Sequence, residues 1–252
     1  MTRVLVVGDV HGNFEALAAW SAAVRAAHGP VDAILAVGDV EPNRDDAEAA
    51  GVHGPAKYRR TGDFPYVHHG LLDLGAPLHF IGGNHEPWPA LDAAGPGRWS
   101  GDVYFLGRAG TAEVAGLRVA FLSGIHSPRV SEAARPRRET LKDRTYYSAG
   151  ELARVRRADR PHILLTHDWP AGIGDGLPYD SVGRPELLDL TRRLRPRWHF
   201  CGHMHRRHHA TVGPTEVVCL AHIRDGAPAF ALIEPGPDGE LGLAPVEAAA
   251  PA

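Results

Sequence analysis

Five short apolar runs along the chain each end abruptly in polar residues. The runs read VLVV, AILAV, LHFI, HILLT and WHFC, and the motifs in which they end are GDVHG, GDV, GGNHE, THDWP and GHMH. Runs this short and this uniformly apolar, rich in Val, Ile and Leu, predict strands that are buried on both faces of a sheet. Each of the five strands therefore delivers polar groups at its carboxyl end.

The segments between these runs predict helices and further strands. Apolar residues recur at helical spacing from Phe14 to Val24, and Gly29 follows as a stop signal. A second helix, RPELLDLTRRLRP, leads into the WHFC strand. DVYFLG, TAEVAG and LRVAFLSG predict hairpin-connected strands, and TEVVCLAH and PAFALIEP predict the last two strands. The pattern as a whole predicts a mixed α/β domain.

The same pattern divides the chain into one domain and a tail. Residues 1–235 carry all the predicted elements, whereas residues 236–252 have little to bury and are expected to form a disordered tail. Two long polar segments, Glu41 to Gly70 and His126 to Gly150, are expected to be structureless insertions with a functional role. The second has six basic and three acidic residues, a surplus that could meet substrate phosphates or simply be solvated.

Composition and charge exclude several classes of protein. The chain has 27 basic and 30 acidic residues, so its net charge of -3 gives no global footprint for nucleic acid or an anionic membrane. Cys201 and Cys219 form no close-spaced pair, which argues against a disulfide framework or a thiolate zinc site and fits a reducing compartment. The apolar run before Asp9 is too short for the one expected of a signal peptide, and no later run approaches the length of a membrane span. A cytoplasmic protein is expected, with its oligomeric state open.

The polar groups after the five runs share the capacity to ligate a metal ion. In open α/β sheets ligands bind at the carboxyl ends of strands, because loops from neighbouring strands converge there on one crevice. A single DxH or HxH pair is a weak signal, whereas five ligand-bearing strand ends in one domain are a strong one. The candidate residues are Asp9, His11, Asp39, Asn84, His85, His167, His203 and His205.

The donor types restrict the metal. Carboxylate, amide oxygen and imidazole groups without a thiolate suit Mn, Fe, Zn, Ni or Co, and they disfavour copper-thiolate and iron-sulfur sites. This many candidates exceeds the needs of one ion, and a shared carboxylate could bridge two ions about 3.5 to 4 Å apart, as in phosphoester hydrolases. Such a pair would turn a bridging water into hydroxide and neutralise the phosphate oxygens during in-line attack, so no nucleophilic side chain is needed.

The remaining histidines are expected to have ordinary roles. The chain has 16 histidines, so some clustering arises by chance. His199 lies inside the WHFC run, where strand alternation gives it a packing position, and His208 and His209 are expected to be solvated or at the rim of the cleft. Hydrogen-bonded or solvated positions are expected for His28, His53, His68, His69, His79, His126, His162 and His222.

In this order, GDVHG, GDV, GGNHE, THD and GHMH resemble the motifs of the calcineurin-like metallophosphoesterase superfamily. The resemblance implies a four-layer α-β-β-α sandwich of two mixed sheets flanked by helices. It also implies that one ion would be held by Asp9, His11 and His205. The other ion would be held by Asn84, His167 and His203. Asp39 would bridge the two ions, and His85 would face the substrate, where it would stabilise charge on the phosphate or protonate the leaving oxygen.

Longer motifs narrow the resemblance to the catalytic core of the RNA lariat debranching enzymes. These motifs are GDVEPNRDD, GPAKYRRTGDF, IGGNHEP, VYFLGRAG, GLRVAFLSGI, LLTHDWP and LLDLTRRLRPRWHFCGHMH, and they span residues 3–235. The resemblance makes Glu41 to Gly70 part of the family pattern, with candidate phosphate or base contacts at Arg44, Lys57, Tyr58 and Arg59. Two features depart from eukaryotic members: they place a cysteine where this chain has Asp9, and they carry a carboxyl-terminal domain after the core.

The favoured function is metal-dependent hydrolysis of a phosphodiester in a nucleotide or nucleic acid such as RNA, with manganese as the favoured ion. The alternative is a phosphomonoesterase with the same site, in which Arg44 or the loop arginines would neutralise the extra charge of a monoester. An inactive scaffold is disfavoured because every ligand position is intact. A nucleic-acid-binding module without catalysis is disfavoured by the net charge and by the absence of an interleaved aromatic and basic stripe.

Overall fold

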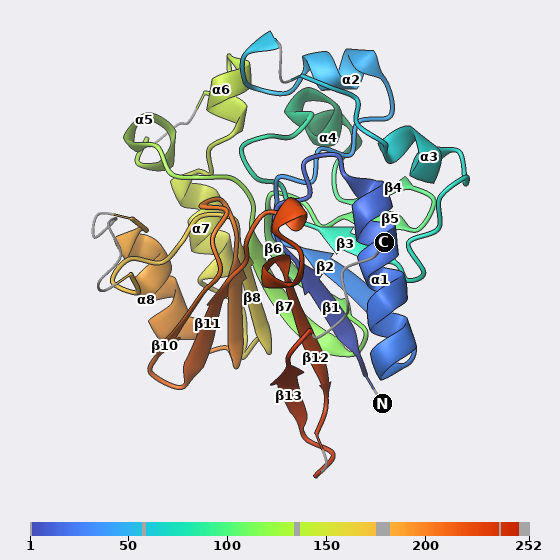
Figure 1. Cartoon of the computed structure of the whole chain (residues 1–252). Coiled ribbons are helices and arrows are strands. Elements are labelled where there is room, and N and C mark those ends of the chain that lie inside the picture. Colours follow the sequence, from blue (N-terminus) through green and yellow to red (C-terminus); the bar gives the residue numbers. More distant parts are fainter. Residues whose placement is uncertain (1, 57–58, 134–136, 175–181, 237, 247–252) are drawn as a thin grey trace.

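Two β-sheets lie face to face in the computed structural model, with helices on their outer sides (Figure 1). The structure describes residues 2–56, 59–133, 137–174, 182–236 and 238–246. The first sheet has seven strands in the order β13 (Leu241–Ala244), β12 (Phe230–Pro235), β1 (Val4–Val7), β2 (Ala33–Ala36), β3 (Leu78–Phe80), β5 (Val103–Phe105) and β4 (Gly97–Ser100). The second has six strands in the order β10 (His208–Val212), β11 (Thr215–Cys219), β9 (Trp198–Cys201), β8 (Ile163–Thr166), β7 (Leu117–Leu122) and β6 (Ala109–Val114).

Both sheets are mixed, with a parallel centre and antiparallel edges. Strands β1, β2, β3 and β5 run parallel in the first sheet, as do β7, β8, β9 and β11 in the second. At the edges, each added strand pairs antiparallel with its inner neighbour; these strands are β12, β13, β4, β6 and β10. The predicted architecture of two mixed sheets flanked by helices is therefore confirmed.

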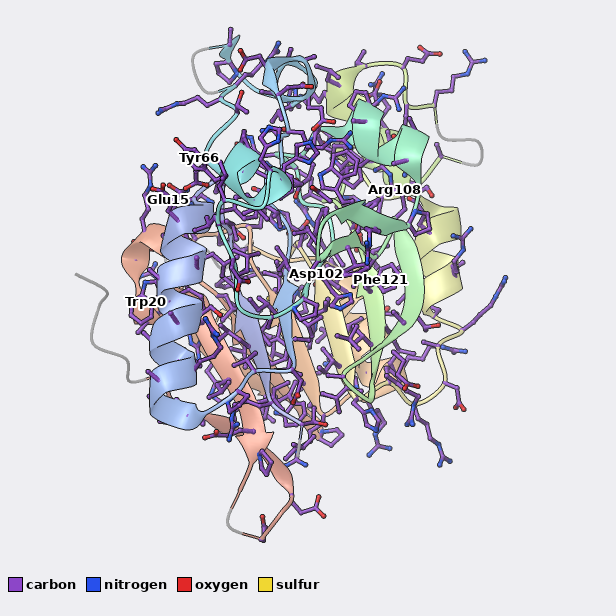
Figure 2. The ribbon with its side chains drawn as sticks, turned by 90° about the vertical axis from the view of Figure 1, so that its right-hand side faces the viewer. Glu15, Trp20, Tyr66, Asp102, Arg108 and Phe121 are labelled. Carbon is purple, nitrogen blue, oxygen red and sulfur yellow. The ribbon has the colours of Figure 1, made fainter. Side chains whose placement is uncertain are left out.

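The central strands are apolar throughout because both of their faces are covered. Val4 and Val6 of β1 pack between the two sheets, against side chains such as Phe121 and Phe200. Leu5 and Val7 face the opposite way, into a core that includes Phe14 and Trp20 of α1 (Phe14–His28). Figure 2 shows α1 lying along the outer side of the first sheet. The apolar runs of the sequence are thus strands buried on both sides.

The outer side of the second sheet is covered by α7 (Ala149–Val155) and α8 (Pro185–Leu194). Their apolar side chains, such as Leu152 and Leu190, pack on Leu122 and Leu164 of the sheet. Helix α4 (Trp88–Ala94) instead joins the core on the outer side of the first sheet, through Trp88 and other side chains. Among the described residues, no helix is long and apolar enough to cross a bilayer.

Three sequence expectations about the secondary structure need correction. Of the three strands expected to be joined by hairpins, only β6 and β7 form one with each other; β5 pairs with β3 and β4 in the other sheet. The polar segments are not structureless, because the first contains α2 (Asp46–Ala50) and α3 (Phe64–His68), and the second contains α5 (Pro128–Ser131) and α6 (Leu141–Arg144). Capping explains part of this order: Thr140 and Ser148 form capping boxes with Asp143 and Glu151.

The third correction concerns the expected tail. Strand β13 pairs antiparallel with β12, so the segment after Gly236 extends the first sheet instead of leaving it. Leu241 and Leu243 are partly buried against the core between the sheets, which supplies the apolar contact that a loose tail would lack. Residues 237 and 247–252 lie outside the described part of the chain.

Candidate metal centre

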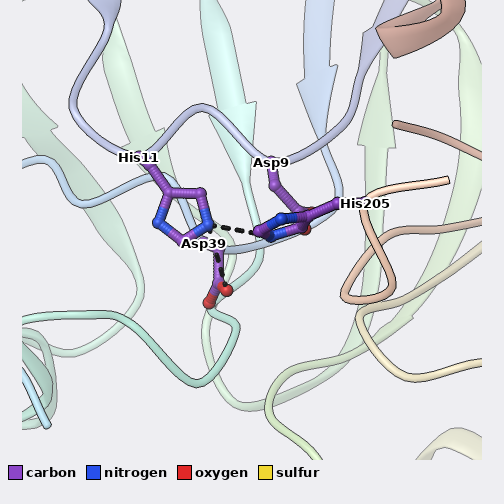
Figure 3. A group of neighbouring side chains, drawn as sticks. All are labelled: Asp9, His11, Asp39 and His205. Atoms are coloured by element: carbon purple, nitrogen blue, oxygen red, sulfur yellow. Dashed lines mark hydrogen bonds and ion pairs between the residues drawn. The ribbon is translucent and has the colours of Figure 1, made fainter. Parts of the chain in front are cut away.

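The loops after β1, β2, β3, β8 and β9 meet at one edge of the sandwich and bring all the predicted ligands together. Four of them form a compact cluster, drawn in Figure 3: Asp9, His11, Asp39 and His205 each place a ligand atom within 4.8 Å of the others. His205 Nε2 lies 3.0 Å from Asp9 Oδ2, and His11 Nε2 lies 3.1 Å from His205 Nε2. Both carboxylates are buried, whereas His205 is exposed, so the cluster is open to solvent on one side.

A second group of donors lies beside this cluster and shares Asp39 with it. His167 Nε2 is 3.2 Å from Asn84 Oδ1 and 3.4 Å from Asp39 Oδ1. The ring of His203 is 5.1 Å from the ring of His167, measured between centroids. The other oxygen of Asp39, Oδ2, lies 3.6 Å from His11 Nε2. Asp39 therefore directs one carboxylate oxygen at each group.

The donor geometry fits a cation. His167 Nδ1 lies 2.9 Å from the backbone oxygen of Val37, which can only accept, so Nδ1 carries the hydrogen. In the neutral ring Nε2 then presents a lone pair, and this lone pair faces the oxygen atoms of Asn84 and Asp39. Several lone pairs directed at one point repel each other unless a positive charge lies between them. The residues present therefore suit a divalent metal ion at this position.

The local electrostatics are strongly negative, which raises the basicity of two histidines. Burial lowers the pKa of His11, but its hydrogen bond to Glu41 and the charges of Asp39, Glu41 and Asp9 outweigh burial and raise the pKa to about 9. Burial also lowers the pKa of His167, and the charge of Asp39 more than reverses this and raises it to about 10. A metal ion would compete with these protons, so metal binding at this site should release protons.

The backbone that carries the ligands adopts conformations that side chains rarely favour. His11, Asp39, His203 and His205 have φ angles of 47°, 48°, 69° and 50°. A non-glycine residue in this left-handed region costs on the order of 1 kcal/mol or more, and such residues gather at functional sites. Half of the eight such residues in the described chain are thus predicted ligands.

Glu86, at the end of the GGNHE motif, ties two ligand loops together. Its buried carboxylate accepts hydrogen bonds from the backbone N–H groups of Val40 at 2.9 Å, Glu41 at 3.0 Å and Gly83 at 3.2 Å. Burial, together with the charge of Asp39, raises the pKa of Glu86 to about 8. Gly83 is also constrained, because a Cβ there would lie 2.2 Å from Asp39 Oδ1. These residues fix the loops of Asp39 and Asn84 against each other.

His85 lies next to the ligands but is turned toward a hollow in the surface. Its backbone N–H donates to Asp39 Oδ1 at 2.7 Å, and its ring centroid is 5.4 Å from that of His11. The side chain lines a cavity of about 340 Å³ that the ligands His11 and His205 also line. From this position the imidazole can reach a molecule bound over the cluster.

Arg44 and Arg59, the two predicted substrate contacts that the structure describes, are both bonded to other residues of the first polar segment. Arg44 pairs with Glu48 and stacks on Trp99, 4.0 Å from the ring centroid, so its guanidinium is engaged by neighbouring side chains. Arg59 is exposed, and its Nε donates to the backbone oxygen of Gly54 at 3.0 Å. Lys57 and Tyr58 lie outside the described residues.

The basic surplus of the second polar segment is mostly used in ion pairs. Arg129 pairs with Asp143, which belongs to the same segment. Arg138 pairs with Glu151 at 2.5 Å, and Arg144 pairs with Asp92 at 2.8 Å. The surplus seen in the sequence is therefore largely balanced by acidic partners, two of which, Glu151 and Asp92, lie outside the segment.

Among the cavity-lining residues that the sequence analysis did not assign to the site are Arg60, His222 and Arg224. His222 stacks on the ring of His11 with 5.1 Å between centroids and meets the ring of His205 edge-on at 5.1 Å. It follows β11, so the strand-end rule that identified the predicted ligands could have placed it at the site too. The expectation of a packing role for His199 is confirmed, since it is buried between Thr166 and Thr191.

Known proteins share the sequence pattern. Residues 2–207 match the family model described as calcineurin-like phosphoesterase. Lariat debranching enzymes of Schizosaccharomyces pombe, Mus musculus and Entamoeba histolytica are 29%, 30% and 27% identical to this chain. The alignments cover 83%, 81% and 88% of this chain and 49%, 41% and 69% of the relatives. The chain therefore spans about half the length of the first two relatives or less.

Solved structures share the fold. The TT1561 protein of Thermus thermophilus superposes with a TM-score of 0.57 at 16% identity, covering 98% of this chain and 99% of that one. A putative 5'-nucleotidase from Staphylococcus aureus gives a TM-score of 0.51 at 13% identity, covering 97% of this chain and 53% of the other. At these identities the likeness concerns the arrangement of strands and helices alone.

Proposed function

Because this chain belongs to the calcineurin-like phosphoesterase family, we propose that it is a metal-dependent hydrolase of phosphodiesters in a nucleotide or nucleic acid, RNA among them. The observation that carries the proposal is the position of Asp39 between two groups of donors, with Oδ2 toward His11 and Oδ1 toward His167. The likeness to lariat debranching enzymes over more than four fifths of the chain supports a diester substrate.

Two divalent ions are proposed, with manganese favoured. The first would be held by Asp9, His11 and His205. The second would be held by Asn84, His167 and His203. Asp39 would serve both, which is the role that its two carboxylate oxygens suit. When bound, the ions would supply a hydroxide for in-line attack and would neutralise the phosphate oxygens.

The protein's own side chains would orient the substrate and move a proton. His85, on the wall of the cavity, would hydrogen-bond to the phosphate or donate a proton to the leaving oxygen, since imidazole exchanges protons near neutral pH. Glu41 Oε1 lies 2.7 Å from His11 Nδ1 and would keep that ring turned toward the cluster. His222, stacked on His11, would restrict the ring further.

The monoesterase alternative rests on a different observation. Arg60 and Arg224 line the same cavity and could neutralise the second negative charge of a phosphomonoester. The diester is favoured because the cavity has room beyond one phosphate, about 340 Å³, and would accommodate a substituent on each side of the ester.

A side-by-side rate measurement tests the proposal. Hydrolysis of bis(p-nitrophenyl) phosphate and of p-nitrophenyl phosphate, which share a leaving group, should be compared with manganese present. A faster rate on the diester is expected, together with a loss of about 10²-fold or more in the His85→Ala variant, with its metal content unchanged. A preference for the monoester would contradict the diester assignment. A wild-type rate in His85→Ala would show that His85 neither binds the phosphate nor donates the proton in the rate-limiting step.

A further inference from the structure

Two arginines, Arg60 and Arg224, line the cavity of about 340 Å³ beside the metal cluster. The cavity is also lined by histidines of the site and by Glu41, whose carboxylate is paired with His11. Its volume lies within the range of pockets that hold whole small-molecule ligands, and it exceeds the space that one phosphate group requires. The cavity can therefore hold a further charged group of the substrate.

Arg224 is held in place by a neutral partner. Its Nε and Nη2 donate to Asn13 Oδ1 at 3.1 Å and 2.9 Å, and its backbone N–H donates to His222 Nδ1 at 3.0 Å. Asn13 is itself fixed, because its Nδ2 donates to the backbone oxygens of Val10 and His11. An amide partner orients the guanidinium without cancelling its charge, so Arg224 presents a positioned positive charge to the cavity.

Arg60 is brought to the cavity by a tight contact between two loops. Gly62 approaches Gly12 so closely that a Cβ on Gly62 would lie 2.7 Å from the backbone oxygen of Gly12. Asp63 continues this contact, since its carboxylate accepts from the backbone N–H groups of Phe14 and Glu15. The backbone oxygen of Arg60 accepts from Asn43 Nδ2 at 3.0 Å. The loop of Arg60 is thus fastened to the loop that carries His11.

Arg60 and Arg224 differ in charge pairing from three arginines of the polar segments. Arg44, Arg138 and Arg144 each pair with a carboxylate, as shown above. For Arg60 and Arg224, no ion pair to a carboxylate of another described residue is found. Two uncompensated guanidinium groups facing one cavity favour an anionic ligand there, and bidentate geometry makes phosphate a suitable one.

We propose that Arg60 and Arg224 form a subsite for a phosphate that neighbours the one being hydrolysed. The preferred substrate would then be an oligonucleotide with consecutive phosphates, in contrast to an isolated ester. This inference rests on the proposed phosphodiesterase function and specifies its substrate class. The reacting phosphate would lie over the metal cluster and His85, while the neighbouring phosphate would meet the arginines on the cavity wall.

Binding calorimetry in EDTA, which prevents metal-dependent turnover, tests the subsite separately from catalysis. The probes are a dinucleotide with phosphates on both its 5' and 3' ends and the same dinucleotide without them, so that either chain direction is covered. In the wild type the terminal phosphates should strengthen binding about tenfold or more. The Arg60→Gln/Arg224→Gln variant should lose most of that ratio. Arg192→Gln, which removes an exposed charge on α8, should keep it.

A ratio near one in the wild type, or a wild-type ratio in the double variant, would overturn the subsite. An unchanged ratio in the double variant would also be obtained if the arginines bound the reacting phosphate, because the variant would then bind both dinucleotides more weakly by the same factor. Arg60→Gln alone, a change at an exposed side chain, provides the same comparison if the double variant does not fold. Failure of the wild type to hydrolyse any diester would defeat the proposed function, whereas the binding ratios would still decide the subsite.

Discussion

At the scale of single residues, the ligands depend on neighbours that hold their rings and carboxylates. His11 has a left-handed backbone, with a φ of 47°, and its Nδ1 is 2.7 Å from Glu41 Oε1. A carboxylate in this position fixes the tautomer that leaves Nε2 free for a metal, and it makes the ring a stronger donor. The Glu41 side chain is only 11% exposed, so its contact with His11 is largely shielded.

Removing the charge of Glu41 should therefore weaken metal binding. We expect the Glu41→Gln variant to bind Mn²⁺ about 10- to 100-fold less tightly than the wild type, because the His11 ring loses its anionic partner. The affinity is measured by calorimetric titration of the metal-free protein. Glu234→Gln, which breaks an ion pair with Arg3 instead, is the matched control and should bind as the wild type does. Equal affinity in Glu41→Gln would show that this contact has no role in holding the metal.

The residues proposed as ligands could be selected from the sequence, whereas the residues that support them could not. Asp9 and His205 follow apolar runs directly, so a local pattern places them at strand ends. Glu41 and Arg224 show no such local pattern. Their roles depend on contacts with His11 and Asn13 that only the folded chain creates. His222 also follows a strand, although the sequence pattern predicts only a hydrogen-bonded or solvated position for it.

At the scale of elements, strand β9 joins the site to the core. It carries His203 and His205 in the loop after it, while His199 within it is fully buried. The His199 ring nitrogens lie 2.8 Å and 2.9 Å from the hydroxyl oxygens of Thr166 and Thr191. Burial lowers the pKa of His199 to about 3, so the ring is neutral in the folded protein.

The depressed pKa makes stability depend on pH in a defined direction. The unfolded chain takes up a proton on His199 near pH 6.5 but the folded protein does so only near 3, so stability is complete above 6.5 and falls as the pH drops toward 3. Between pH 7 and pH 5 this residue should cost about 2 kcal/mol of unfolding free energy. Urea unfolding in EDTA measures this effect. The drop in unfolding free energy from pH 7 to pH 5 should be smaller by that amount in His199→Gln than in the wild type.

The comparison between wild type and variant isolates His199, because the other histidines titrate in both proteins. His209→Gln, at an exposed position, is the control and should leave the pH dependence unchanged. An identical loss of stability in wild type and His199→Gln would mean that His199 does not carry the effect.

Pairing between elements could be predicted only in part. The five apolar runs are strands as predicted, since their periodicity is local information. The pairing partners of strands are not local information. For example, β5 joins the first sheet and β6 the second, although only Leu106, Gly107 and Arg108 separate them. Cys201 and Cys219, far apart in sequence, are register partners on β9 and β11 with 3.3 Å between their sulfur atoms. Such neighbours are set by the sheet order, which a single sequence does not display.

At the scale of the whole molecule, the site exists because two sheets end at one edge. The first sheet supplies Asp9, His11, Asp39 and Asn84, and the second supplies His167, His203 and His205. The packed core between the sheets holds the two sets at a constant separation, so the donors are in place before an ion binds. The two-sheet arrangement came from the family resemblance, since strand and helix patterns alone predict only a mixed α/β domain.

The central claim is that this edge holds two divalent ions that share Asp39. The most direct measurement is the number of Mn²⁺ ions bound per chain at saturation, by elemental analysis after removal of free metal. We predict close to two ions in the wild type and at most one in a His167→Ala variant, whose first cluster is intact. A single ion in the wild type, or two ions retained in His167→Ala, would contradict the dinuclear centre.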